Sequence, residues 1–173
     1  MAKQFVALAI ALAGLVALTA CGGDKAASAP AELTIREAVE VADPQAAIDA
    51  IYDTLEGSVV KELGAQGLID ELQLQPSQLE AYYIFVSDAN YGLCDIILLE
   101  VPEGTTEEGR EVFRKALFSY QDKRMAEFKN FDIWDSSLIA QNAAVFDQGN
   151  FVIMLMLPDN EAAQELIDQY IPR

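Results

Sequence analysis

The sequence predicts a single α+β domain in which an antiparallel four-stranded sheet, made of two β-hairpins, packs with three or four helices. Two pairs of short apolar runs, each pair joined by turn residues, indicate the hairpins. Amphipathic stretches of helical period surround and separate these pairs, an order typical of an α+β fold. A body of about 140 residues buries roughly two-thirds of its unfolded surface, which is enough to fold without disulfides.

Residues 1–20 have the features of a signal peptide. Lys3 supplies a positive charge, and Phe5–Ala20 is apolar except for a glycine and a threonine. This run is shorter than the ~20 residues of a membrane-spanning helix but matches the apolar core of a signal peptide.

The segment Leu18-Thr19-Ala20-Cys21-Gly22 resembles the lipobox of bacterial lipoproteins. The resemblance implies that the Cys21 thiol is lipidated, that the preceding peptide bond is cut, and that the protein is held on the extracytoplasmic face of the cell membrane. Two acyl chains anchor a protein firmly, because each buried CH₂ contributes ~0.8 kcal/mol. Residues 21–32 then read as the lipidated cysteine and a flexible spacer, and residues 33–173 as the domain. The alternative is an uncleaved anchor or an ordinary signal peptide with a chance cysteine.

The first helix is predicted between Asp43 and Gly57. Asp43 is the expected N-cap, Pro44 the first helical residue, and Gly57 the stop. A weaker helical stretch is expected over residues 58–72, because two glycines interrupt it.

Two further helices are predicted later in the chain. Thr105 and Glu108 are placed to form a capping box at the start of a helix over residues 105–128. Asp159 or Asn160 is expected to cap the last helix. The apolar residues expected to be buried recur at helical spacing: Phe113, Ala116, Leu117, Tyr120 and Phe128 in one, Ala163, Leu166, Ile167 and Tyr170 in the other.

Four strands are predicted, at Ala81–Ser87, Asp95–Val101, Ala143–Asp147 and Phe151–Leu157. Gly149 is expected to provide a positive φ in the second hairpin turn. The second and fourth strands are almost wholly apolar, so we expect them in the centre of the sheet, covered on both faces.

The chain is strongly acidic, with 28 acidic and 11 basic residues and a net charge of −17. This charge repels phosphate backbones and anionic headgroups, which argues against nucleic-acid binding and against electrostatic docking on lipid. Solubility is the simpler explanation of the charge, and a diffuse attraction for cations or basic partners is the other.

The sequence lacks the residue patterns of the common catalytic and metal-binding sites. It contains no histidine, which excludes Ser-His-Asp and Cys-His arrangements. Once Cys21 is alkylated, Cys94 has no disulfide partner; we interpret it as a core residue, with a reactive thiol as the alternative. No phosphate-binding loop or zinc motif is present. The sequence therefore predicts no cofactor and no catalytic residue.

Carboxylates remain as candidates for chemistry. Asp88, Asn90, Asp132 and Asp135 offer oxygen ligands, but they do not form a calcium-binding loop motif. We interpret them as solvated loop residues and predict no metal site. A pair of acids of the glycosidase type stays open, because the distance between two carboxylates is a tertiary property.

The aromatic residues are expected mainly in the core. The alternative is that Tyr91, in the first hairpin loop, and Trp134, after the long helix, are exposed together and form a contact surface for a partner or a glycan.

The C-terminal half contains the segments "FKNF" at Phe128–Phe131 and "LIAQNAAVFDQGNFVIMLMLPDN". Through them, the stretch from about Leu79 to Ile171 resembles a family of bacterial surface lipoproteins, common in Gram-positive bacteria of the Clostridia type, that carry a domain of unknown function. The residues that match its pattern are Leu138, Ala143, Val145, Gly149, Asn150, Phe151 and Val152. It implies a surface lipoprotein without an established activity, so no functional residue carries over.

Two hypotheses follow for function. The first is a non-enzymatic, lipid-anchored surface protein whose partners are the membrane, through its anchor, and an unknown protein or envelope ligand. The second is a carboxylate-based hydrolase of envelope glycans, which requires a cleft with two buried carboxylates.

Overall fold

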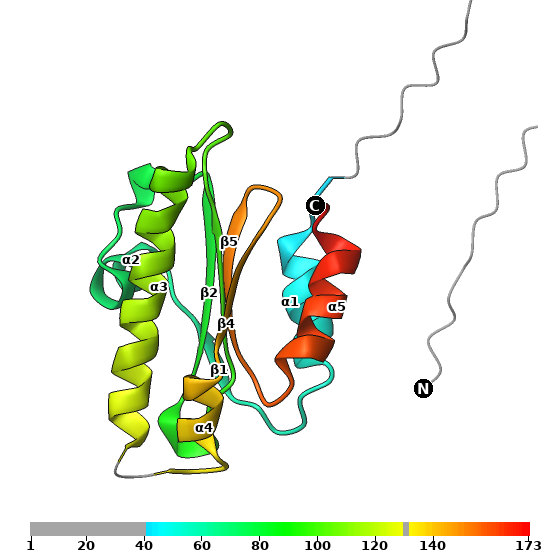
Figure 1. Ribbon diagram of the computed structural model, residues 1–173. Helices are drawn as coiled ribbons and strands as arrows, with labels where there is room; N and C mark the ends of the chain where they lie inside the picture. Colours follow the sequence, from blue (N-terminus) through cyan, green and yellow to red (C-terminus); the bar gives the residue numbers. More distant parts are fainter. Residues whose placement is uncertain (1–40, 130–131) are drawn as a thin grey trace, which may run out of the picture. The chain divides into compact units, whose positions relative to one another are not determined.

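The structure of the protein is a computed structural model. A five-stranded antiparallel sheet forms its middle layer (Figure 1). Its strands lie in the order β1 (Val60–Glu62), β2 (Ala81–Ser87), β3 (Asp95–Glu100), β5 (Phe151–Met156) and β4 (Ala144–Gln148). Each neighbouring pair is antiparallel. The two expected hairpins thus lie side by side, joined through β3 and β5.

The structure describes residues 41–129 and 132–173. The signal peptide, Cys21 and the spacer, all predicted within residues 1–32, lie outside the described residues. Among the described residues, no helix is both long and apolar enough to cross a membrane.

Helices cover both faces of the sheet (Figure 1). One face carries α1 (Pro44–Tyr52) and α5 (Asn160–Tyr170), and the other carries α2 (Ala65–Leu72), α3 (Glu107–Phe128) and α4 (Ser136–Gln141). Each helical layer builds its own apolar cluster against the sheet. The described part of the chain is therefore a three-layer structure with two cores.

The prediction that the two most apolar strands are central is confirmed. Every residue of β5 is buried, and in β3 every residue except Glu100 is buried. Successive side chains of a strand point to opposite faces, so Ile97 and Met154 join the cluster under α3 while Ile96 and Leu155 join the one under α1 and α5. Each fully buried side chain of this kind contributes about 1.5–3 kcal/mol.

The number of strands differs from the prediction, because the stretch expected as a weak helix over residues 58–72 contains strand β1. Val60, Lys61 and Glu62 pair with the outer edge of β2. That edge offers unpaired backbone groups, and satisfying them there outweighs the weak helix signal of a glycine-interrupted segment. Helix α2 begins only after Gly64, which is its N-cap.

The predicted helix ends are partly confirmed. Asp43 caps α1 by accepting a hydrogen bond from the Ala46 amide (3.1 Å), and Asp159 caps α5 in the same way. The capping box of Thr105 and Glu108 is wrong. Thr106 is the N-cap of α3, with its hydroxyl accepting from the Gly109 amide (3.2 Å), while the Thr105 hydroxyl donates to the Pro102 carbonyl. Helix α1 ends at Tyr52, before Gly57, and α4 was not predicted, so five α-helices are described.

The two ends of the described chain lie at one end of the sheet, and several loop connections lie at the other. At one end the Asp43 amide donates to the Tyr170 carbonyl (2.9 Å), so the described chain begins beside its C-terminus. Gly149, with φ of 54° as predicted, makes the β4–β5 turn there. At the opposite end, the α1–β1, β2–β3 and β5–α5 connections meet the segment before α4 (Figure 1).

Candidate functional site

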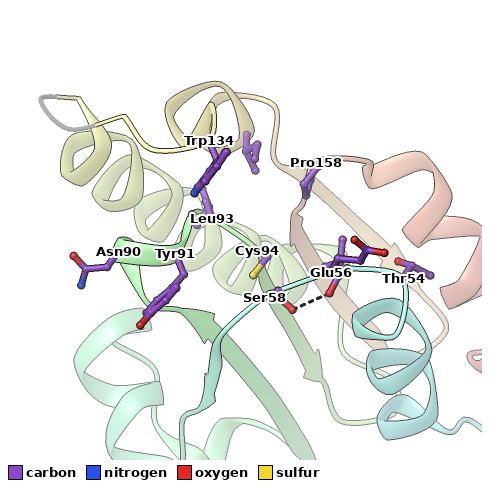
Figure 2. A pocket seen from close by; sticks show the side chains of 13 residues that line it. Thr54, Glu56, Ser58, Asn90, Tyr91, Leu93, Cys94, Trp134 and Pro158 are labelled. Carbon is purple, nitrogen blue, oxygen red and sulfur yellow. Dashed lines mark hydrogen bonds between the residues drawn. The ribbon is translucent and has the colours of Figure 1, made fainter.

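A pocket of about 720 Å³ lies at this second end of the sheet (Figure 2). Its walls come from the α1–β1 connection (Thr54–Ser58), the β2–β3 connection (Asn90–Cys94), Trp134 before α4, Ile139 of α4, and Pro158 after β5. This volume lies in the range of small-molecule sites, which are concave and lined by apolar groups with a few polar ones.

The structure brings Tyr91 and Trp134 to the same pocket although they are far apart in the sequence. Both side chains are exposed, Tyr91 at 57% and Trp134 at 78%. The tryptophan lies over Gly92: a Cβ at Gly92, whose φ is 90°, would come within 3.2 Å of Cδ1 of Trp134. Glycine at this position therefore allows the indole to approach the β2–β3 connection.

Trp134 and Asp135 both adopt left-handed backbone conformations, with φ of 53° and 57°. Such a conformation is rare for a bulky residue and costs of order 1–3 kcal/mol. The segment is held by contacts on either side of the two residues. Asp132 accepts hydrogen bonds from the amide (2.8 Å) and the hydroxyl (2.7 Å) of Ser137. The strained backbone presents the indole at the pocket mouth.

Ser136 joins the segment before α4 to the β2–β3 connection. Its buried hydroxyl accepts a hydrogen bond from the Leu93 amide (3.0 Å) and donates to the Ile133 carbonyl. The two walls that carry Tyr91 and Trp134 are therefore tied to each other by a serine side chain.

Asp88 organises the start of the β2–β3 connection. Its carboxylate accepts from the amide (2.9 Å) and the side-chain nitrogen (2.7 Å) of Asn90, at the short 3₁₀ helix Ala89–Tyr91. These hydrogen bonds lower the pKa of Asp88, and those from Ser137 lower the pKa of Asp132. Both carboxylates are ionised at neutral pH and shape loops, in line with the interpretation that they are solvated loop acids.

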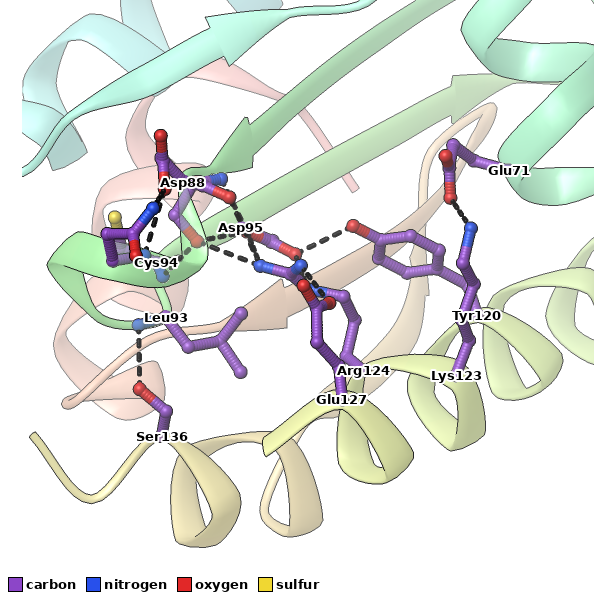
Figure 3. A network of polar contacts seen from close by, with 12 residues as sticks. Glu71, Asp88, Leu93, Cys94, Asp95, Tyr120, Lys123, Arg124, Glu127 and Ser136 are labelled. Atoms are coloured by element: carbon purple, nitrogen blue, oxygen red, sulfur yellow. Dashed lines mark hydrogen bonds and ion pairs between the residues drawn. The ribbon is translucent and has the colours of Figure 1, made fainter. Parts of the chain in front are cut away.

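A buried polar network lies directly behind the pocket, centred on Asp95 (Figure 3). One oxygen of Asp95, Oδ1, accepts from the amide (2.7 Å) and the hydroxyl (2.6 Å) of Ser87. The other, Oδ2, accepts from the Tyr120 hydroxyl (2.7 Å). Burial raises the pKa of the Asp95 carboxyl, while Arg124 and these hydrogen bonds oppose the shift. Burial also raises the pKa of Tyr120, so its hydroxyl remains a donor.

Arg124 reaches the same carboxylate from α3. Its Nε lies 2.9 Å from Asp95 Oδ2, although Nε finds no hydrogen-bond acceptor among the described residues. Nη1 donates to Glu127 (2.6 Å), and Nη2 donates to the carbonyl (3.2 Å) and the hydroxyl (3.1 Å) of Ser87. The guanidinium also lies over the ring of Phe128, 5.2 Å from its centre. The network thus fixes α3 against the ends of β2 and β3.

Cys94 connects the network with the pocket. It lines the pocket, its amide donates to the Ser87 hydroxyl (3.1 Å), and its carbonyl accepts from the Tyr52 hydroxyl (3.0 Å). Burial, with the nearby Asp95 carboxylate, raises the pKa of the Cys94 thiol to about 11. The thiol is therefore protonated at neutral pH, which fits a packing role better than a nucleophilic one.

The residues lining the pocket contribute one carboxylate, that of Glu56. Asp95, the buried carboxylate, is engaged by Arg124 rather than facing a second acid. In the described part of the chain, no group of three or more His, Cys, Asp or Glu residues is placed to hold a metal ion. The loop acids Asp88, Asp132 and Asp135 belong to the segments that build the pocket but are not among the residues that line it.

Comparison with known protein families gives a match. The family model described as "Domain of unknown function (DUF4358)" matches residues 53–157. The chain belongs to this family. The DUF4358 match covers the whole sheet with α2, α3 and α4, and it includes every pocket-lining residue except Pro158. No curated protein and no solved structure matches the chain.

Sequence reasoning missed the network inside this DUF4358 domain. One signal was present: Asp95 opens a strand that continues with four apolar residues and was expected to be covered on both faces. Arg124 gave another, since it lies four residues from both Tyr120 and Phe128 on the apolar stripe of α3. A charge on each of two facing apolar surfaces indicates a buried pair, but the sequence does not show that the two surfaces meet.

Proposed function

We propose that this protein is a lipid-anchored surface protein that binds a small organic ligand, or an exposed side chain of a partner, in the pocket between the loop connections. The observation that carries the proposal is that Tyr91 and Trp134, both exposed, line one pocket of about 720 Å³. Exposed aromatic rings are costly to leave in water and mark contact sites in soluble domains.

The backbone around Trp134 supports the same site. Two adjacent non-glycine residues in the left-handed region are strained, and such strain gathers at ligand sites, where the surrounding structure maintains it. The hydrogen bonds of Asp132 and Ser136 maintain it here. An indole needed only for packing would not require this arrangement, because Trp134 is mostly exposed.

The hydrolase hypothesis has less support. Hydrolysis of a glycosidic bond by two carboxylates needs a pair facing one another across the cleft, roughly 5–10 Å apart. The residues lining the pocket supply Glu56 alone. Binding without hydrolysis is therefore the function that this geometry favours.

The anchor is proposed from the sequence. The lipobox at Leu18–Cys21 would place the domain outside the cell membrane, attached through the lipidated cysteine and spacer of residues 21–32. Within the domain, residue 41 and the pocket lie at opposite ends of the sheet. Mass spectrometry of the N-terminal peptide tests the anchor: we expect Cys21 as first residue with a diacylglyceryl thioether. An unmodified Cys21, or a chain still starting at Met1, would refute it.

The pocket is tested with 2-phenylethanol, a neutral molecule with one aromatic ring and a hydroxyl. Saturation-transfer difference NMR on the full chain in a non-ionic detergent should detect its binding. Trp134→Gly should abolish the signal, whereas Phe118→Ala, at an exposed aromatic residue on α3, should leave it unchanged. Binding that survives Trp134→Gly would contradict the proposal, and so would a failure of both this probe and its ammonium and carboxylate analogues to bind.

A further inference from the structure

The charged side chains in the segments that build the pocket are all acidic. Residues 53–59, 88–94, 132–135 and 157–159 contain no lysine or arginine. Their carboxylates belong to Asp53, Glu56, Asp88, Asp132, Asp135 and Asp159. The nearest basic residues along the chain are Lys61 and Lys129, which do not line the pocket. These segments therefore contribute only negative side-chain charge around the aromatic pocket, while the guanidinium of Arg124 in the network behind them is paired with Asp95 and Glu127.

We propose that the pocket selects an organic cation, an ammonium or quaternary ammonium group attached to an apolar body. This inference rests on the proposed binding function and specifies its ligand class. The apolar body would pack on the walls formed by Leu55, Leu93 and Ile139. The cationic group would lie near Glu56 and the faces of the aromatic rings.

The two exposed rings favour a cation over a neutral ligand. A cation over the face of Trp or Tyr is attracted by the ring quadrupole, and tryptophan is the strongest of the aromatic partners. Trp134 and Tyr91 are exposed on the pocket's loops, with Glu56 across from them on the α1–β1 connection (Figure 2). Aromatic faces recognise ammonium groups by this interaction, and the Glu56 carboxylate adds an opposite charge.

The same residues disfavour the other ligand classes. An anion would meet the carboxylates without a lysine or arginine on the pocket's walls to compensate. A metal ion needs several oxygen ligands converging at 2.0–2.6 Å, roughly the Ca²⁺ and Mg²⁺ distances, and the described acids form no such group. Asp88 and Asp132 are already hydrogen-bonded within their own loops. Dispersed negative charge around apolar walls suits a large cation with low charge density.

Three probes with the same ring but different charge test the inference: phenethylammonium, 2-phenylethanol and phenylacetate. Titrations followed by saturation-transfer difference NMR give the dissociation constant of each for the full chain. At low salt we expect phenethylammonium to bind about tenfold more tightly than 2-phenylethanol, with phenylacetate weakest. The preference should shrink as ionic strength rises from about 0.01 M to about 0.5 M, because screening shortens the reach of the loop charges.

Glu56→Gln should weaken phenethylammonium binding by about two- to fivefold, the effect of one partly exposed ion pair, and leave 2-phenylethanol unaffected. Glu103→Gln is the matched control, since Glu103 is an exposed acid in the β3–α3 connection at the other end of the sheet. Equal binding of the cation and the alcohol, both lost in Trp134→Gly, would overturn the cation inference and leave the proposed pocket standing. Tighter binding of phenylacetate would also overturn it. No binding of any probe would overturn both.

Discussion

Arg124 of α3 and Asp95 of β3 form a buried ion pair, with Nε of the arginine 2.9 Å from Oδ2 of the aspartate. The side chain of Asp95 is fully buried and that of Arg124 is 8% exposed. The pair joins helix α3 to the first residue of the central strand β3, next to the pocket. One electrostatic contact therefore positions the pocket wall that carries Leu93 and Cys94. Removing one partner of such a pair leaves an uncompensated charge in the interior.

Arg124→Met should therefore destabilise the domain strongly, by about 3–5 kcal/mol. Urea denaturation followed by circular dichroism measures the free energy of unfolding. The double variant Asp95→Asn/Arg124→Met should be more stable than Arg124→Met alone, because it removes both charges.

Lys123→Met is the matched control for this prediction. Lys123 is the neighbouring residue on α3, and its ion pair with Glu71 is solvent-exposed, so the loss should stay below about 1 kcal/mol. Equal losses for Arg124→Met and Lys123→Met would show that the buried pair has no special role.

Gly92→Ala should both destabilise the domain and weaken probe binding. The positive φ of 90° makes any L-residue unfavourable there, and the new methyl group would press on Trp134. We expect a loss of at least about 1 kcal/mol in urea denaturation. Gly104→Ala separates the two causes, since Gly104 has a similar φ of 79° with no atom within 4 Å of the added Cβ. If both variants bind 2-phenylethanol like the parent chain, Gly92 does not position Trp134.

Trp134→Gly should abolish binding without lowering stability. Glycine adopts the left-handed region at little cost, so the substitution relieves strain at φ of 53°. The exposed indole buries little surface that would be lost. The free energy of unfolding should stay equal or rise by about 1 kcal/mol. A clear drop in stability would mean that the indole is a packing residue.

Cys94 should be unreactive in the folded protein at neutral pH. Its pKa is raised from 9.0 to about 11, so the folded protein retains the thiol proton between these values while the unfolded chain has lost it. The stabilisation linked to this proton is complete below pH 9 and is lost as the pH rises toward 11. Alkylation of the Cys94 peptide by iodoacetamide, followed by mass spectrometry, should accelerate with a midpoint near pH 11. A midpoint near pH 8.5 would contradict this.

The main elements of the fold could be predicted because their signals are local. Alternating and continuous apolar runs located β2 to β5, and Asp43 and Asp159 marked helix starts through their own side chains. Strand β1 could not be predicted, because its three residues become a strand only through the edge of β2. Thr105 and Thr106 carry the same hydroxyl, so only the backbone geometry decides which of them caps α3.

Only single residues of the site, and not the pocket itself, could be identified from the sequence. Tyr91 and Trp134 were candidates for an exposed contact surface, but their position in one pocket depends on how α4 packs beside the β2–β3 connection. Glu56 gave no signal, since an acid at the end of a predicted helix resembles any solvated residue. The pocket is a product of tertiary packing, which brings together connections that are remote in the chain.

The most direct test of the ligand pocket is a map of amide chemical-shift changes when phenethylammonium is added to the ¹⁵N-labelled full chain. The largest changes should fall in residues 54–58 and 90–94 and at Trp134, including its indole N–H. They should be absent in the Trp134→Gly variant. Changes gathered instead on the outer face of α3, or at the β4–β5 turn at the other end of the sheet, would contradict the assignment of this pocket as the binding site.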